Sequence, residues 1–151
     1  MKAIDGYNKL RGGYYTPSAI SKFITEWAIR SSVDTVLEPS CGDGSFLEAA
    51  VERIQTLGGD STQIRNLITG VELDETEADK AREFGTDVYT GDFFGFYRAE
   101  IEDRKQYDVV IGNPPFIRYQ NFDEKYRETA FDLMEKHGFH PNRLTNIWLP
   151  F

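Results

Sequence analysis

Short runs of β-branched residues alternate along this chain with longer segments of helical period, and this alternation most constrains the fold. The runs lie at residues 33–37, 67–71, 87–90 and 107–111. Predicted helices flank them, at residues 17–28, 44–57, 74–84 and 123–137. Strands that alternate with helices form parallel sheets with right-handed crossovers. We therefore predict an α/β chain, with a parallel sheet that has helices on both faces.

The first predicted helix has both a start signal and an apolar face. Thr16 is a good N-cap, and Pro17 suits the first helical position. Apolar residues then follow at helical spacing, at Ile20, Phe23, Ile24, Trp27 and Ala28. The pattern predicts an amphipathic helix that begins at Thr16 or Pro17.

Composition excludes several classes of protein. A chain with 40% hydrophobic and 28% charged residues is too apolar to be disordered. Cys41 is the single cysteine, so neither a disulfide framework nor a cysteine-based zinc site is expected. No apolar run approaches the ~18 residues that cross a bilayer, and residues 1–6 lack a signal-peptide core, so we expect a cytoplasmic protein without a membrane partner.

Ligands of open α/β sheets bind beyond the carboxyl ends of the strands, so the loops after the four runs form the candidate site. After the first run, Gly42 and Gly44 permit a tight turn, although the spacing is not GxGxxG. Glu38 and Asp43 accompany this turn, which disfavours a pyrophosphate and favours a ligand with positive charge. The alternative is a tight βα turn without a ligand.

Carboxylates follow the next two runs. Glu72 can accept hydrogen bonds from the two hydroxyls of a ribose, or it can be a solvated strand end. Asp92 can accept a hydrogen bond from the exocyclic amine of a purine while Phe93 packs on the ring. The alternative for Asp92 is a turn residue after Gly91.

The strongest local signal is Asn113-Pro114-Pro115-Phe116, after the fourth run. The two prolines fix the backbone and remove two donors. An Asn oxygen and a neighbouring carbonyl can accept both hydrogens of an amino group, and Phe116 can stack on the ring that carries it. The alternative is a rigid loop with a packed phenylalanine.

Together these loops resemble the S-adenosylmethionine-dependent N6-adenine DNA methyltransferases. The likeness is to gamma-type N-6 DNA methylases of restriction-modification or phage-defence systems, and it is carried by residues 13–17, 36–47, 70–74, 91–94 and 108–119. It implies a Rossmann-like class I methyltransferase sheet, S-adenosylmethionine as cofactor, and no metal. The reaction it implies is methyl transfer to the N6 amine of adenine in DNA.

The resemblance assigns the cofactor contacts residue by residue, to Tyr15, Thr16, Pro17, Glu38, Ser40, Cys41, Gly42, Gly44, Glu72, Leu73, Asp92 and Phe93. Thr16 and Pro17 would hold the methionine part of the cofactor, and Glu38 would meet its ammonium group. Glu72 would take the ribose hydroxyls and Asp92 the adenine amine. Cys41 is interpreted as a small loop residue and not as a nucleophile.

The same resemblance assigns the catalytic residues, which are Asn113, Pro114, Pro115 and Phe116. Asn113 and the carbonyl of Pro114 would accept hydrogen bonds from N6 of the target adenine. Phe116 would stack on that adenine after it has flipped out of the duplex.

The resemblance also implies a longer protein. Its sheet has seven strands, of which this chain supplies the first four, so we expect the domain to be truncated after the fourth. Residues 1–32 would be an N-terminal helix region, and residues 33–151 the half that carries the cofactor site and the catalytic loop. The target-recognition domain would be absent, and with it the basic surface for double-stranded DNA, because the net charge here is −8. A restriction or specificity protein is a candidate partner.

Three other functions compete with this prediction. An enzyme that methylates a protein glutamine or an RNA base would also need a clamp for an amino group. A cofactor-binding fragment, inactive by itself, would bind S-adenosylmethionine weakly or serve as an assembly module. A nicotinamide oxidoreductase is disfavoured by the missing GxGxxG and by the acidic first loop.

Overall fold

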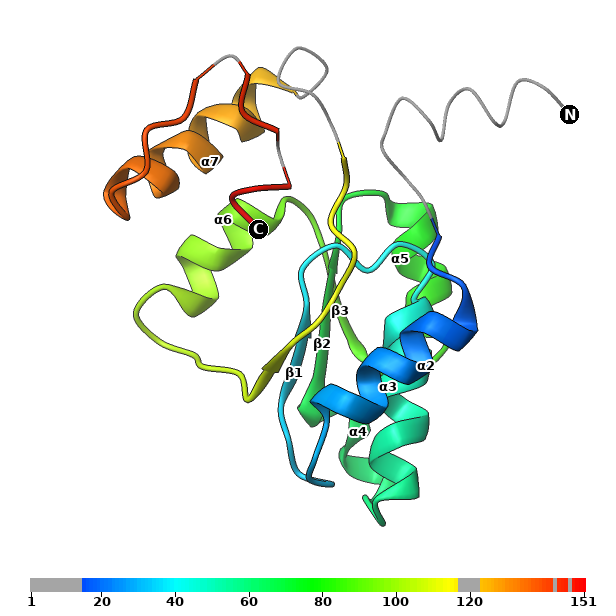
Figure 1. The fold of residues 1–151 in the computed structure, drawn as a ribbon. Helices are drawn as coiled ribbons and strands as arrows, with labels where there is room; N and C mark the ends of the chain where they lie inside the picture. Colours follow the sequence, from blue (N-terminus) through cyan, green and yellow to red (C-terminus); the bar gives the residue numbers. More distant parts are fainter. Residues whose placement is uncertain (1–14, 117–122, 143, 147) are drawn as a thin grey trace, which may run out of the picture. The chain divides into compact units, whose positions relative to one another are not determined.

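A computed structural model describes residues 15–116, 123–142, 144–146 and 148–151 (Figure 1). Parts of the predicted match, residues 13–14 and 117–119, lie outside the described residues. The chain forms two compact units, Tyr15–Asn113 and Met1–Tyr14 together with Pro114–Phe151, and each is described by itself. The assignment of residues 1–32 and 33–151 to parts of one catalytic domain stays a prediction.

The first unit is built on a four-stranded sheet. Its strands are β1 (Val36–Glu38), β2 (Ile68–Glu72), β3 (Asp87–Thr90) and β4 (Val109–Val110), in the order β3-β2-β1-β4. All neighbouring pairs are parallel, and Val36 pairs with both Ile68 and Val109. The predicted parallel α/β sheet is therefore confirmed.

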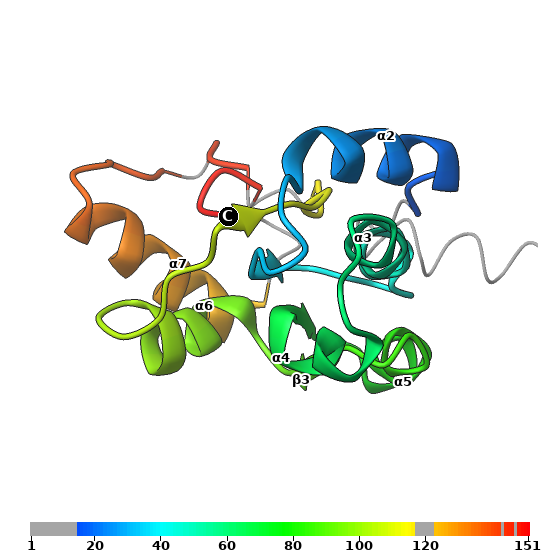
Figure 2. The same ribbon diagram turned by 90° about the horizontal axis from the view of Figure 1, so that it is seen from below.

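Helices cover both faces of this sheet (Figures 1 and 2). On one face lie α2 (Ser18–Ala28), α3 (Ser45–Thr56) and α5 (Glu75–Arg82), and on the other lie α6 (Phe93–Phe96) and the π-helical turn η2 (Tyr97–Ile101). The 3₁₀ turn η1 (Ser61–Gln63) and α4 (Ile64–Leu67) lead into β2. The prediction missed η1, α4, α6 and η2 because one helical turn is too short to show a period.

The second unit contains α7 (Glu124–Lys136), whose start is capped by Asp123 as predicted: its side chain accepts a hydrogen bond from the backbone N–H of Lys125. This helix buries Ala130, Leu133 and Met134. Over the described ranges of both units, no helix is long and apolar enough to cross a membrane.

Each face of the sheet has its own apolar core. Leu47 and Ile54 of α3 pack with Val36 and Ile68 of the strands in the larger core. Leu37 and Val71, which point to the other face, pack with Phe96 of α6. Burial on both faces explains why β1 and β2 read as continuous apolar runs.

The first helix differs from its prediction. Pro17, not Thr16, occupies the N-cap position, and no side chain caps the helix. Of the predicted apolar face, Ile20, Phe23 and Trp27 are 49%, 71% and 73% exposed.

Ile24 and Ala28 of the predicted face are partly buried against the larger core, and two small hydroxyl residues also lie on the packing side of α2. Ser21 and Thr25 are buried, and Ser21 Oγ lies 3.2 Å from Ser45 Oγ of α3. Thr25 Oγ1 lies 3.0 Å from the carbonyl of Ser21, so its polar atom is satisfied within its own helix. Because these side chains are short and self-satisfied, they pack as well as apolar ones, which hydrophobic periodicity cannot detect.

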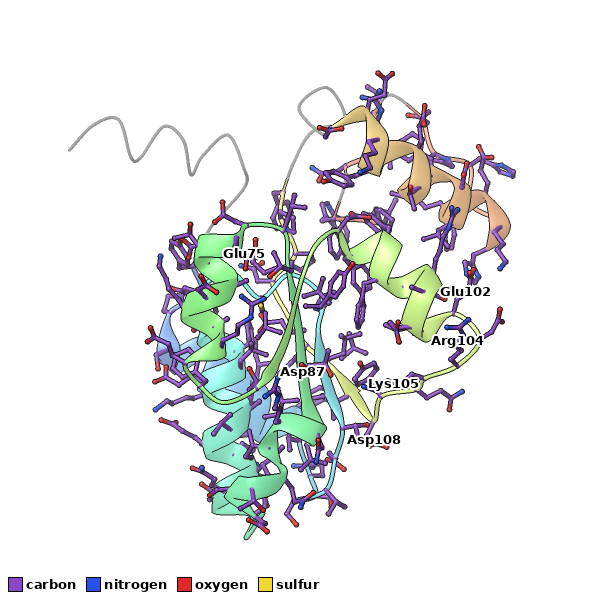
Figure 3. The ribbon with its side chains drawn as sticks, turned by 180° about the vertical axis from the view of Figure 1, so that it is seen from behind. Glu75, Asp87, Glu102, Arg104, Lys105 and Asp108 are labelled. Atoms are coloured by element: carbon purple, nitrogen blue, oxygen red, sulfur yellow. The ribbon has the colours of Figure 1, made fainter. Side chains whose placement is uncertain are left out.

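At the amino ends of the strands a side chain joins β1 to β4. Asp108 Oδ2 accepts hydrogen bonds from the backbone N–H of Thr35 (2.8 Å) and from its hydroxyl (2.7 Å). These bonds lower the pKa of Asp108 below its usual value. Figure 3 shows Asp108 at the end of the sheet opposite Glu75, so this contact sets the register of the sheet far from the candidate site.

A glycine substitution tests the close approach of α3 to α5. Gly44 has φ +92°, and a Cβ there would lie 2.8 Å from Phe84 Cε2 and 3.0 Å from Ala81 Cα. Gly58 has a similar φ of +87° but no atom within 4 Å of its would-be Cβ. We expect Gly58→Ala to lower the free energy of unfolding by about 1–2 kcal/mol, the cost of a left-handed residue, and Gly44→Ala to lower it by more. The measurement is urea unfolding of both variants, and equal losses of unfolding free energy would contradict the close contact at Gly44.

Candidate functional site

The loops after the strands are joined at the carboxyl edge of the sheet. The backbone N–H of Cys41, after β1, donates to the carbonyl of Val71 in β2 (2.9 Å). The N–H of Gly91, after β3, donates to the carbonyl of Glu72 (2.8 Å). Since parallel strands end at one edge, the loops after β1, β2 and β3 and Asn113 after β4 share it, as predicted.

The loop after β1 turns through two left-handed glycines, Gly42 and Gly44. The N–H of Gly44 donates to the carbonyl of Cys41 (2.9 Å), which closes the turn. Tyr15 lies over this loop, because a Cβ on Gly42 would be 3.9 Å from Tyr15 Cε1. Burial, and then the nearby Glu77 carboxylate, raises the pKa of Tyr15, so its hydroxyl stays protonated.

Glu72 is held by two backbone donors. Its Oε2 accepts a hydrogen bond from Gly42 N (2.9 Å), and its Oε1 accepts one from Asp74 N (2.8 Å). Burial raises the pKa of Glu72, and these hydrogen bonds act in the opposite direction. A carboxylate offers about four lone-pair sites, so this one can accept two more hydrogen bonds from a ligand. Leu73, next along the chain, is 52% exposed and offers an apolar surface beside it.

Glu38, at the end of β1, is buried without a full set of partners. It is 2% exposed, and in the part of the chain that the structure describes its Oε2 has no hydrogen-bond partner. Ser40 Oγ, two residues on, is also buried without a partner among the described residues. Burial raises the pKa of Glu38 well above its usual value, and the charges of Glu72 and Asp43 raise it further.

Such an unsatisfied acceptor is costly unless a ligand meets it. A would-be Cβ on Gly112 would lie 3.6 Å from Glu38 Cγ, so the Glu38 side chain runs beside the end of β4. The donor that fits is cationic, because an adjacent positive charge would restore the ionised form of this carboxyl. This arrangement is compatible with the expectation that the turn suits a positive group, which stays a prediction.

The loop after β3 starts a short helix. Asp92 Oδ2 accepts a hydrogen bond from Gly95 N (2.8 Å), so Asp92 caps α6, in agreement with its interpretation as a turn residue. Phe93 is half-buried, with its ring centroid 5.6 Å from that of Phe94 and 6.3 Å from that of Tyr97. Its position beside Asp92 is compatible with the predicted purine contact, which stays a prediction.

The predicted catalytic residues fall on both sides of the boundary between the units. Asn113 ends the first unit, is exposed, and donates from Nδ2 to Thr16 Oγ1 (3.4 Å). Pro114, Pro115 and Phe116 begin the described part of the second unit. Phe116 is 60% exposed, and its ring centroid lies 6.0 Å from that of Trp148. The joint action of these four residues stays a prediction.

Cys41 is a packing residue, as predicted. It is 5% exposed, and burial raises the pKa of its thiol far above the usual range, so little thiolate forms. A Cβ on Gly70 would lie 3.0 Å from its sulfur, so the glycine in β2 makes room for it.

Arg82 is a structural residue of the site that the sequence did not reveal. It forms an ion pair with Asp79 (2.6 Å), which its spacing on α5 could have indicated. Its other nitrogen donates to the carbonyl of Val88 (3.2 Å) and to the hydroxyl of Thr90, two residues before Asp92. Arg82 thereby holds the end of β3 against α5, a contact between elements for which the sequence carries no signal.

Removing the Glu38 charge is expected to stabilise the fold. The folded chain raises the pKa of Glu38 above its ordinary value of 4.5, so the unfolded chain releases that proton at lower pH. The free energy of unfolding therefore falls as pH rises above 4.5. Glu38→Gln should raise the thermal midpoint at pH 7, and the gain should shrink on acidification toward pH 4. The exposed Glu83→Gln is the control. A gain that does not depend on pH would contradict the proposed cause.

Known proteins resemble both the sequence and the fold. The model of the N-6 DNA Methylase family matches residues 4–149. Type II methyltransferase M.HincII of Haemophilus influenzae is 30% identical over 121 residues, which are 80% of this chain and 20% of that protein. The methylase subunit of the Type I restriction enzyme MjaVIII of Methanocaldococcus jannaschii is 28% identical over 154 residues, covering 91% of this chain and 25% of that protein.

The likeness extends to a solved structure, a class I S-adenosylmethionine-dependent methyltransferase from Listeria monocytogenes. It aligns with a TM-score of 0.64 at 16% identity, over 93% of this chain and 41% of that one. The expected class I methyltransferase sheet is thereby confirmed. With a family model that matches nearly all of its length, this chain belongs to the N-6 DNA methylase family.

Proposed function

We propose that this chain carries the cofactor seat and part of the acceptor clamp of a methyltransferase that transfers a methyl group from S-adenosylmethionine to N6 of adenine in DNA. The observation that carries the proposal is the open acceptor on buried Glu38, at the edge of the sheet that also presents Asn113. Membership of the N-6 DNA methylase family supports the same reaction.

The residues at the edge suit each part of this cofactor. The Glu38 carboxylate and Ser40 hydroxyl have free hydrogen-bonding capacity for its ammonium group. Glu72 keeps two acceptor sites for the ribose hydroxyls. Leu73 and Phe93 offer apolar surface for its adenine. Asp92 accepts a hydrogen bond from the amine of that adenine. The methionine end of the cofactor is held by Tyr15, Thr16 and Pro17. When bound, the cofactor supplies a methyl group already activated by its sulfonium.

The residues of the clamp prepare the acceptor. The exocyclic nitrogen of adenine is a poor nucleophile because its lone pair is delocalised into the ring. Asn113 Oδ1 and the carbonyl of Pro114 each accept a hydrogen bond from this amino group, which localises its lone pair on nitrogen. Phe116 stacks on the ring of the flipped adenine. N6 gains the methyl group as the bond from that methyl to sulfur breaks, and the extra proton on N6 then leaves to water. Alignment of the two reacting groups supplies the largest share of the rate.

The partners are argued from the relatives. One matched relative is a Type II methyltransferase and another is a methylase subunit of a Type I restriction enzyme. This chain spans 20% of the first and 25% of the second. We infer that further polypeptide recognises the DNA and supplies its basic surface, and that a restriction or specificity subunit is the protein partner. The tests that follow also distinguish DNA from the two other candidate methyl acceptors, a protein glutamine and an RNA base.

Residues 1–151 alone are expected not to methylate DNA. The chain has a net charge of −8, which opposes binding to the phosphates of a duplex. The measurement is transfer of a labelled methyl group to unmethylated plasmid DNA, with the full-length protein as positive control. Labelling of plasmid by residues 1–151 would contradict the proposal that further polypeptide is needed to bind the DNA. If the full-length protein labelled RNA or protein in place of DNA, the proposed methyl acceptor would be wrong.

Asn113→Ala in the full-length protein should abolish methylation and leave cofactor affinity within about twofold. Asn113 accepts the target amine and lies outside the proposed cofactor contacts, so the two readouts should separate. Calorimetry with S-adenosylhomocysteine measures the affinity, and Asn66→Ala, an exposed asparagine on α4, is the matched control. A loss of cofactor affinity in Asn113→Ala would count against the assigned role.

A further inference from the structure

The amide of Asn113 can serve the proposed reaction in one of its two orientations. Its oxygen and its nitrogen have nearly the same shape, but only the oxygen accepts a hydrogen bond from an amino group. With the amide reversed, two donors would face each other. The site therefore needs a group that binds the Asn113 nitrogen and so leaves Oδ1 toward the substrate.

The structure offers Thr16 for this task. Asn113 Nδ2 donates to Thr16 Oγ1 at 3.4 Å, a contact between residues 97 positions apart in the chain. The hydroxyl of Thr16 is available for it, because α2 begins after Pro17 with no side-chain cap.

Thr16 is itself held from two sides. Its carbonyl accepts a hydrogen bond from Ser45 Oγ in the first turn of α3 (2.9 Å). It precedes Pro17, which restricts its backbone to extended conformations. The end of β4 is equally fixed, because the N–H of Ile111 donates to the carbonyl of Leu37 (3.0 Å). Two restrained segments thus bring this hydroxyl and this amide together.

We propose that Thr16 is a positioning residue that orients the Asn113 amide, so that Oδ1 faces the amino group to be methylated. This role rests on the proposed function and is additional to the cofactor contact expected of Thr16. The hydroxyl accepts from Nδ2 in the productive orientation, so both ends of the amide are satisfied when the substrate amine is bound. In the reversed orientation the hydroxyl could donate to Oδ1, but the substrate amine would then face Nδ2, a second donor. The hydroxyl and the bound amine therefore favour the productive orientation together, and without the hydroxyl Nδ2 loses its partner there.

The test uses Thr16→Val, which keeps the shape and removes the hydroxyl, and Thr16→Ser, which keeps the hydroxyl. In the full-length protein at saturating S-adenosylmethionine, we expect Thr16→Val to lower the methylation kcat on plasmid DNA about tenfold, the order expected for one lost hydrogen bond. Thr16→Ser should restore most of it. A kcat for Thr16→Val equal to that of the unmodified protein would overturn the proposal.

A second measurement does not depend on turnover. The side-chain NH₂ signals of Asn113 in a ¹⁵N-labelled sample are identified by their loss in Asn113→Asp. Thr16→Val should shift these signals and speed their hydrogen exchange, and Thr16→Ser should leave them close to their original positions. Unchanged signals in Thr16→Val would show that the hydroxyl does not hold the amide.

The outcomes separate this proposal from the one on which it rests. Full methylation by Asn113→Ala would remove the proposed role of Asn113 and with it the need for orientation. Loss of methylation in Asn113→Ala, together with normal kcat and unchanged amide signals in Thr16→Val, would overturn the role of Thr16 alone. A change in cofactor affinity without a change in kcat would leave Thr16 as a cofactor residue only, and would likewise overturn it.

Discussion

Glu72 holds the candidate site together. Its Oε2 accepts a hydrogen bond from the glycine loop after β1, its Oε1 accepts one from Asp74, and its own carbonyl accepts one from Gly91 after β3. One residue at the end of β2 thus connects three of the four loops that follow the strands. A ligand that also bound this carboxylate would meet an oxygen pair whose position is already fixed, so little ordering entropy would be lost on binding.

The electrostatics of the edge oppose stability and favour a ligand. Glu38 and Glu72 both have pKa values raised by burial, and the charge of Glu72 raises the pKa of Glu38 further. A core optimised for stability alone would not bury an acceptor such as Glu38 Oε2, which has no donor within reach among the residues that the structure describes. Conflict between local energetics and the fold is expected at functional sites.

The sheet, and the edge at which the candidate site residues lie, could be predicted from the sequence, whereas the roles of those residues stay predictions. β1 and β2 are buried on both faces, so their continuous apolar runs identify them as strands. The ends of these runs predicted where Glu38 and Glu72 lie in the sheet. The short helix α6 gave no periodic signal. Asp92 caps it, in agreement with the alternative of a turn residue, and its predicted contact with a purine stays a prediction.

The errors are as informative as the successes. Of the apolar face predicted for α2, Ile24 and Ala28 pack against the core, but Ile20, Phe23 and Trp27 are exposed. The prediction missed Ser21 and Thr25, which are buried on the packing side and whose hydroxyls find partners nearby. Thr16 was interpreted as a helix cap, whereas its hydroxyl contacts Asn113, a partner far along the chain that no local pattern reveals. Arg82 was missed although its partners are near in sequence, because its contacts with Val88 and Thr90 join a helix to a strand and no helical or strand period reports them.

The pairing of β1 has a consequence for synthesis on the ribosome. β1 lies in the middle of the sheet, and its two neighbours are made at very different times, since Val36 pairs first with Ile68 and much later with Val109. The loops that join at Glu72 are complete once residue 92 has emerged, while one side of β1 still lacks its partner. Closing this long-range pairing is intrinsically slow. The growing chain therefore passes through a stage in which three strands present an unpaired apolar edge, the kind of surface that chaperones protect.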